Sequence, residues 1–208
     1  AADYENLGHV NFLLKKYLKA KEYFEKALVI RAEIGDRTGE AEGFLNLGIM
    51  FESLWQLVEA KKYFEKALTL NNEIGNRKGQ AKCYVYIGTM SISFGEYIKA
   101  KVNLETALAI ATEIGYRQGE AFCYKGLGDV LCNSVGDYIK AKDYVERALA
   151  ITTEIGDREG EASCYKGLRN VLFLLGDYNR AKECDERALA INIEIGEDRK
   201  STRLNSSH

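Results

Sequence analysis

The strongest constraint on this chain is a segment of the form Glu-Ile-Gly-x-Arg-x-Gly-(Glu/Gln)-Ala that recurs along it. Complete copies start at Glu33, Glu73, Glu113 and Glu154, and a fifth copy that starts at Glu194 breaks off early. The starting points are 40, 40, 41 and 40 residues apart. A period in this range is typical of a solenoid, in which each repeat buries its apolar face against its neighbours. Solenoids of this kind bind partners and seldom catalyse reactions.

Each repeat contains two stretches of helical periodicity separated by a short break. In the second repeat, apolar and small residues recur at steps of three and four, as on one face of a helix. The first stretch carries Ala41, Phe44, Leu47, Gly48 and Phe51, and the second carries Leu57, Ala60, Phe64, Ala67, Leu68 and Ile74. We expect an antiparallel pair, called helix A and helix B below. The predicted fold is all-α, with one array over residues 1–197 and repeats at about 1–35, 36–75, 76–115, 116–156 and 157–197.

Glycines and charged residues mark the expected helix ends. Gly95, Gly136 and Gly176 precede the start of helix B, and glycine can take the left-handed conformation that ends a helix. Because the fourth repeat has one extra residue before Gly136, we expect Asn133 and Ser134 to bulge.

The arginine of the recurring segment stands beside the end of the preceding helix B. A cation at that place satisfies carbonyl groups and opposes the negative end of the helix dipole. The alternative is a ladder of partner-facing arginines. These residues are Arg37, Arg77, Arg117 and Arg158.

The order of large and small residues resembles the tetratricopeptide repeat. In the first repeat the matching residues are Tyr4, Leu7, Gly8, Tyr17, Ala20, Phe24 and Ala27. Later repeats follow in register, but in the fifth Arg169 replaces the glycine and Asp185 replaces the phenylalanine. The 40-residue period and the absence of proline are similar to a subgroup that includes Pins-type and rapsyn-type scaffolds and large repeat-array proteins. The resemblance implies a right-handed superhelical solenoid with a peptide-binding concave groove.

Composition excludes several other classes. The formal net charge is −2, with Lys and Arg interleaved with acids, so nucleic acid is not an expected partner. No apolar run is long enough to span a bilayer, and we expect no membrane partner. Cys83, Cys123 and Cys164 occupy one position in successive repeats, which stacking should hold too far apart for disulfides. This pattern favours packing cysteines in a reduced, cytoplasmic compartment.

Catalytic and cofactor chemistry find little support. His9 is the only histidine outside the last residue. A nucleophilic Cys–His pair needs a base within hydrogen-bond reach of a thiol, and the cysteines instead belong to the repeating pattern of later repeats. Cysteines and histidines at zinc-binding spacings are lacking, and the glycines form no phosphate-binding loop. We therefore expect neither an enzyme nor a cofactor or metal site.

The two ends of the chain suggest a fragment. The sequence begins at Ala1 inside a repeat, without an initiator methionine. Residues 198–208 fit no repeat and closely resemble a translated sequencing adapter, so we interpret them as a non-native tail. The alternative is a short, disordered native tail.

Side chains of helix A that are not needed for stacking are expected to line the groove. The candidate peptide-binding residues are Asn6, Asn46, Ile49, Lys82, Tyr86, Lys125, Lys166 and Asn170. An asparagine can hold a peptide backbone with both its donor and its acceptor, as members of the resembled family do. The three lysines suit an acidic segment, although a solvated face with arbitrary charges is the simpler alternative.

The expected function is that of a scaffold or adaptor that binds an extended segment of an unidentified protein. One alternative is a regulatory or targeting segment of a larger enzyme, such as a protease with a caspase-like CHAT domain. Another is a structural array that self-associates through its ends.

Overall fold

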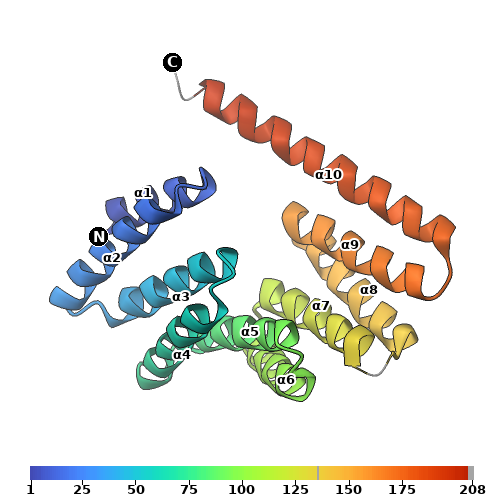
Figure 1. Cartoon of the computed structure of the whole chain (residues 1–208), viewed down its shortest axis with the longest axis horizontal. Coiled ribbons are helices and arrows are strands. Elements are labelled where there is room, and N and C mark those ends of the chain that lie inside the picture. Colours follow the sequence, from blue (N-terminus) through green and yellow to red (C-terminus); the bar gives the residue numbers. More distant parts are fainter. Residues whose placement is uncertain (135, 206–208) are drawn as a thin grey trace. The chain divides into compact units, whose positions relative to one another are not determined.

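The computed structural model describes the backbone of residues 1–134 and 136–205 and the side chains of residues 1–134 and 136–196. Within the described residues the chain forms ten helices and no strand (Figure 1). The helices are α1 (Ala2–Leu13), α2 (Tyr17–Glu33), α3 (Arg37–Ser53), α4 (Leu57–Glu73), α5 (Arg77–Ser93), α6 (Tyr97–Glu113), α7 (Arg117–Ser134), α8 (Tyr138–Glu154), α9 (Arg158–Leu174) and α10 (Tyr178–Asn205). The prediction for residues 198–208 lies outside the described side chains and stays a prediction.

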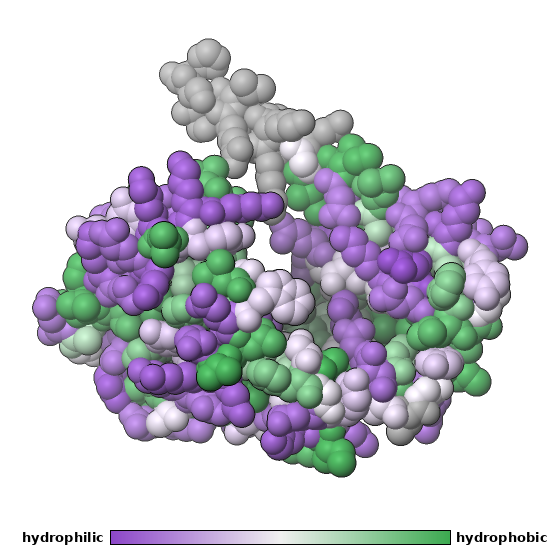
Figure 2. All heavy atoms as spheres, viewed as in Figure 1, coloured by the Kyte–Doolittle hydropathy of each residue, from purple (hydrophilic) through white to green (hydrophobic). Residues whose placement is uncertain are grey.

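The chain divides into two compact units, residues 1–90 (unit 1) and 91–208 (unit 2). In unit 1, α1 packs on α2, α2 on α3, and α3 on α4. In unit 2, α6 packs on α7, and α7–α8 and α9–α10 form further pairs. This architecture confirms the all-α, tetratricopeptide-like fold. Figure 2 shows apolar patches scattered among hydrophilic ones on the surface of each unit.

Small residues allow the paired helices to approach closely. Ala60 and Ala100 are fully buried. A Cβ added to Gly8 would lie 2.6 Å from the ring of Phe24, which leaves no room for a side chain. In the fifth repeat the corresponding residues are Arg169 and Asp185, and the Arg169 Nε donates to Asp185 Oδ1 over 3.1 Å. In the fifth repeat an ion pair therefore replaces the glycine–phenylalanine contact.

The extra residue of the fourth repeat lengthens a helix. α7 has 18 residues, whereas α5 and α9 have 17. Asn133 and Ser134 are its last two residues, and their side chains donate to the carbonyls of Asp129 and Val130. The predicted bulge at these two residues is wrong, because one more helical residue accommodates the insertion. Residue 135, which follows Ser134, lies outside the described residues.

The recurring arginine joins the two helices of its own repeat. Arg37, the first residue of α3, donates to Glu40 over 3.3 Å and to Glu73, the last residue of α4, over 2.6 Å. Arg117 and Arg158 make equivalent pairs in unit 2. These hydrogen bonds and ion pairs of Arg37, Arg117 and Arg158 run to carboxylates. The sequence predicted contacts with carbonyl groups at the end of the preceding helix B. Their structural role is to link the start of helix A to the end of helix B.

Candidate functional site

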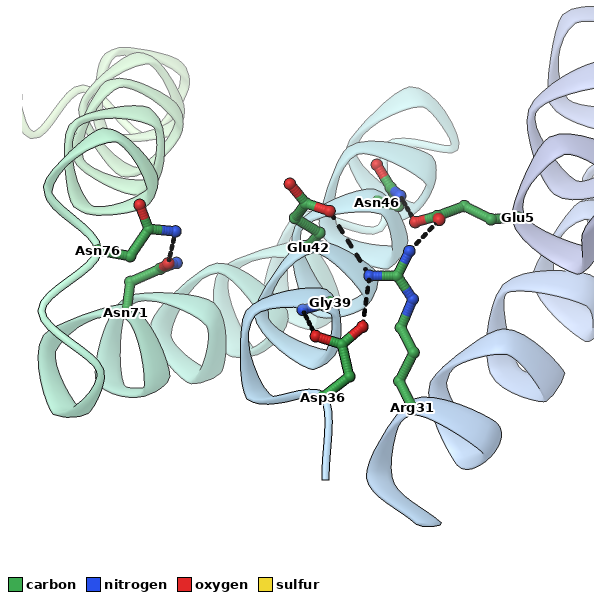
Figure 3. Close-up of polar contacts among 8 residues, drawn as sticks. All are labelled: Glu5, Arg31, Asp36, Gly39, Glu42, Asn46, Asn71 and Asn76. Carbon is green, nitrogen blue, oxygen red and sulfur yellow. Dashed lines mark hydrogen bonds and ion pairs between the residues drawn. The ribbon is translucent and has the colours of Figure 1, made fainter. Parts of the chain in front are cut away.

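Polar side chains of α1, of α3 and of its N-cap residue converge on Arg31 of α2 in unit 1 (Figure 3). Arg31 is only 9% exposed, near the end of α2. Its guanidinium donates to Glu5 and lies 3.7 Å from Asp36 Oδ2 and 3.5 Å from Glu42 Oε2. The Asn46 Nδ2 donates to Glu5 Oε1 over 3.0 Å. We call these five residues the Arg31 cluster. The acids supply the opposite charge that a buried guanidinium requires. Because its members lie on or beside α1, α2 and α3, the cluster links these three helices.

A second buried polar group follows one repeat later. Asn71 occupies the position in α4 that Arg31 occupies in α2. Its Oδ1 accepts from the Asn76 Nδ2 over 2.8 Å (Figure 3). Its backbone carbonyl accepts from the Gln80 side chain over 3.3 Å. The Asn71 Nδ2 donates to the carbonyl of Ala67 over 2.8 Å. Both ends of the Asn71 amide are thereby satisfied, as burial demands.

A pocket of about 190 Å³ in unit 1 borders both groups. It is lined by Thr38, Ala41, Glu42, Leu45, Asn71, Asn76, Lys78, Gly79 and Lys82. Glu42 is paired with Arg31, whereas Lys82 has no ion-pair partner among the residues that the structure describes. The wall therefore offers a cation, amide groups and an apolar surface. Such a combination suits one polar side chain of a bound segment.

The other candidate residues of unit 1 are placed differently. Asn6 is exposed on α1. Ile49 and Tyr86 are half-buried and pack against the unit 1 core, where the Tyr86 and Phe64 rings stack with centroids 5.0 Å apart. Asn46 is already engaged with Glu5, so one of its two donors is used inside the protein. Among the described residues, no hydrogen bond engages the acceptor oxygen of Asn46, which the predicted clamp would also use.

The candidates in unit 2 include one paired lysine. The Lys125 Nζ lies 3.0 Å from Asp129 Oδ2, and both side chains are on α7. Lys166 and Asn170 are exposed on α9. In the described part of unit 2, Lys166 has no ion-pair partner. Lys166 is thus better placed than Lys125 to attract an acidic group.

Sequence reasoning missed Arg31 and Asn71, because it searched only helix A for site residues. The signal was present in helix B. Position 31 and its equivalents follow an Ile or a Leu, and in most repeats they carry a polar residue that breaks the apolar pattern. The residues at this position are Arg31, Asn71, Ala111, Thr152 and Asn192.

The cysteines have the properties of packing residues. Burial raises the pKa of the Cys83 and Cys123 thiols to about 12, and that of the Cys164 thiol to about 11. Such thiols are poor nucleophiles at neutral pH, since the thiolate is the reactive form. The His9 ring packs edge-on against Phe24, with centroids 5.1 Å apart. Within the described residues, no group of His, Cys, Asp and Glu could hold a metal ion, and no helix could cross a membrane.

Paired helices with small-to-large contacts that recur from repeat to repeat define an α-helical repeat protein, and sequence comparison specifies which kind. A profile of the tetratricopeptide repeat matches residues 1–73, 79–154 and 126–194. The chain belongs to the tetratricopeptide repeat family. No curated protein matches it significantly by sequence.

Solved structures with the same fold share about a fifth of their residues with this chain. A Rap protein complexed with competence and sporulation factor has a TM-score of 0.82 at 21% identity, covering 94% of this chain and 54% of that one. The Rap conjugation gene regulator of plasmid pLS20, in complex with the Phr* peptide, has a TM-score of 0.82 at 21% identity, with coverages of 93% and 53%. BtubC from P. vanneervenii has a TM-score of 0.71 at 20% identity, with coverages of 91% and 78%. The chain thus spans about half the length of the two Rap proteins.

Proposed function

We propose that this chain is a protein-interaction module that binds an extended segment of a partner on the helix A side of unit 1. The observation that carries the proposal is the 190 Å³ pocket, whose wall joins Lys82 to the Asn71 amide group. An acidic side chain of the segment would enter this pocket and meet Lys82. Its backbone would donate to the Asn46 oxygen nearby on α3. A fold of this kind is known with a peptide, since the pLS20 Rap regulator was solved with one.

The lysines of unit 2 are proposed as a contact of that unit taken by itself. Lys166 is exposed, so it would attract an acidic group of a partner chiefly during encounter. Lys125 would contribute less, because Asp129 already neutralises it.

The test begins with peptides selected from a random phage-displayed library against the full chain. Selected peptides are then measured against Lys82→Glu and against Lys62→Glu, a matched charge reversal at an exposed lysine of α4. We expect Lys82→Glu to weaken binding at least about tenfold and to reduce its salt dependence, with Lys62→Glu unchanged. Asn46→Ala should speed dissociation, since it leaves a peptide N–H unpaired. Equal binding by all three variants and the parent chain would exclude this site.

A further inference from the structure

The turns between helix A and helix B expose large apolar side chains in unit 1. Leu18 is 87% exposed at the start of α2, and Trp55 and Val58 are 82% and 72% exposed at the α3–α4 turn. Leu13 and Leu14 are exposed at the α1–α2 turn as well. Figure 1 shows that these two turns lie at the same end of the stacked helix pairs. We call these five residues the turn-edge surface.

Each of these two turns places a residue other than glycine in the left-handed backbone region, which costs free energy. Trp55 has a φ of 59° and Lys15 a φ of 58°, in the left-handed region. At the equivalent position, later repeats have Gly95, Gly136 and Gly176, which adopt positive φ without strain. A tryptophan at a strained, exposed turn tip adds nothing to the core. This departure from local rules indicates a role outside folding.

The charge around the turn-edge surface is positive. Lys15, Lys16 and Lys19 surround its leucines in sequence and are exposed. None of the three has an ion-pair partner in the part of the chain that the structure describes. The acids on these two turns are the exposed Glu59 and the half-buried Glu52, whose pKa burial raises. Cations therefore outnumber exposed acids beside the apolar tips.

We propose that the turn-edge surface binds the surface of a membrane that contains anionic lipid. Tryptophan and aliphatic side chains enter the interfacial region of a bilayer, and lysines attract anionic headgroups. Leu18, Trp55 and Val58 protrude individually, with exposed fractions of 87%, 82% and 72%, so a fluid surface fits better than a protein knob. A second copy of the chain would bring like charges together. Such peripheral contact requires no membrane-spanning helix, so it amends the expectation from sequence.

Sequence register adds a related observation. Ile98 and Ile139 occupy the position of Leu18 and Val58 in the third and fourth repeats, and both are highly exposed. Lysine follows at the next position in three of these four repeats, at Lys19, Lys99 and Lys140. The apolar-then-basic pair is thus part of the repeat and is not confined to one turn.

Trp55 is the only tryptophan, so its fluorescence reports directly on the proposed contact. The full chain is titrated with vesicles of phosphatidylcholine alone and of phosphatidylcholine with phosphatidylserine. We expect a blue shift and protection from acrylamide quenching only with the anionic vesicles. An unshifted, fully quenchable Trp55 would overturn the proposal, as would equal binding to both vesicle types.

Two variants separate specific contact from general charge. Changing Lys15, Lys16 and Lys19 to Glu should weaken vesicle binding by more than about tenfold. The same change at Lys61, Lys62 and Lys66 of α4 should leave vesicle binding nearly unaffected, and equal loss in both variants would contradict the proposal.

A third variant, Trp55→Gly, removes the indole ring and relieves the strained turn. Sedimentation with vesicles should show that this variant no longer binds them. Protection of Trp55 by a soluble protein but not by vesicles would assign the surface to a protein partner and overturn the proposal.

Discussion

At the scale of single residues, packing in this protein depends on where a small side chain is required. Ala100 is fully buried in α6, whereas Ala109 on the same helix is exposed. Ala100→Leu should overpack its contact and lower the free energy of unfolding by about 1–3 kcal/mol. Ala109→Leu adds the same atoms on the solvent side and should change it little. Urea unfolding of both variants measures the difference, and equal stabilities would contradict the packing assigned to Ala100.

Replacing the strained turn residue Trp55 by glycine should raise the free energy of unfolding, whereas Ala100→Leu should lower it. A non-glycine residue at φ 59° carries a steric cost that glycine avoids. Trp55→Gly should therefore raise the free energy of unfolding by about 0.5–1 kcal/mol, after the greater flexibility of unfolded glycine is counted. Trp55→Ala retains a Cβ and should give a smaller gain. Thermal unfolding of the two variants distinguishes relief of strain from mere removal of an exposed ring.

The buried thiols predict how stability depends on alkaline pH. Burial raises the pKa of Cys83 and Cys123 from 9.0 to about 12, so below pH 9 the thiols are protonated in both the folded and unfolded states. Above pH 9 only the unfolded thiols ionise, which favours unfolding, and stability should fall progressively between about pH 9 and pH 12. Cys83→Ala should make this fall shallower in urea titrations at pH 8 to 10.5. An unchanged slope would show that Cys83 is ionised in the folded state.

At the scale of helices, the sequence predicted the pairs well because their information is local. A three-to-four step of apolar residues specifies each helix face, and Gly95, Gly136 and Gly176 specify the turns. The predicted bulge at Asn133 and Ser134 failed because α7 continues through both residues and is one residue longer than α5 and α9. The Arg31 cluster was missed for another reason. Its members come from three helices and meet only after those helices pack.

That cluster makes a testable contribution to stability. Glu5 is a largely buried partner of Arg31, so Glu5→Ala would leave a buried guanidinium with only its more distant acids. We expect a loss of about 1–3 kcal/mol in the free energy of unfolding. Asp3→Ala removes an exposed acid from the same helix and serves as the control. If the two variants unfold alike in urea, the Arg31 cluster does not hold α1 against its neighbours.

At the scale of the whole molecule, the repeat period identified the family, but it could not select a binding site. Every helix A offers similar exposed positions, and their charges differ from repeat to repeat. The pocket near Lys82 depends on which side chains are already engaged, as Asn46 is with Glu5 and Lys125 with Asp129. Such pairings require coordinates. Residue types alone could nominate Lys82, Lys125 and Lys166 equally, whereas the structure distinguishes paired lysines from unpaired ones within each unit.

The repeat architecture also predicts how far a destabilising substitution affects the helices around it. In a tandem array, stability is nearly a sum of repeat terms and nearest-neighbour interfaces, so a local defect should open nearby helices without unfolding distant ones. Ala141 is fully buried in α8, and a Cβ added to Gly128 of α7 would lie 3.2 Å from its carbonyl oxygen. Ala141→Leu should therefore speed hydrogen exchange in α7, α8 and α9, which pack on one another, and leave α1 and α2 at their parental rates. Hydrogen exchange followed by mass spectrometry resolves these segments. Uniformly faster exchange in all helices would instead show a single cooperative unit, in which no repeat opens alone.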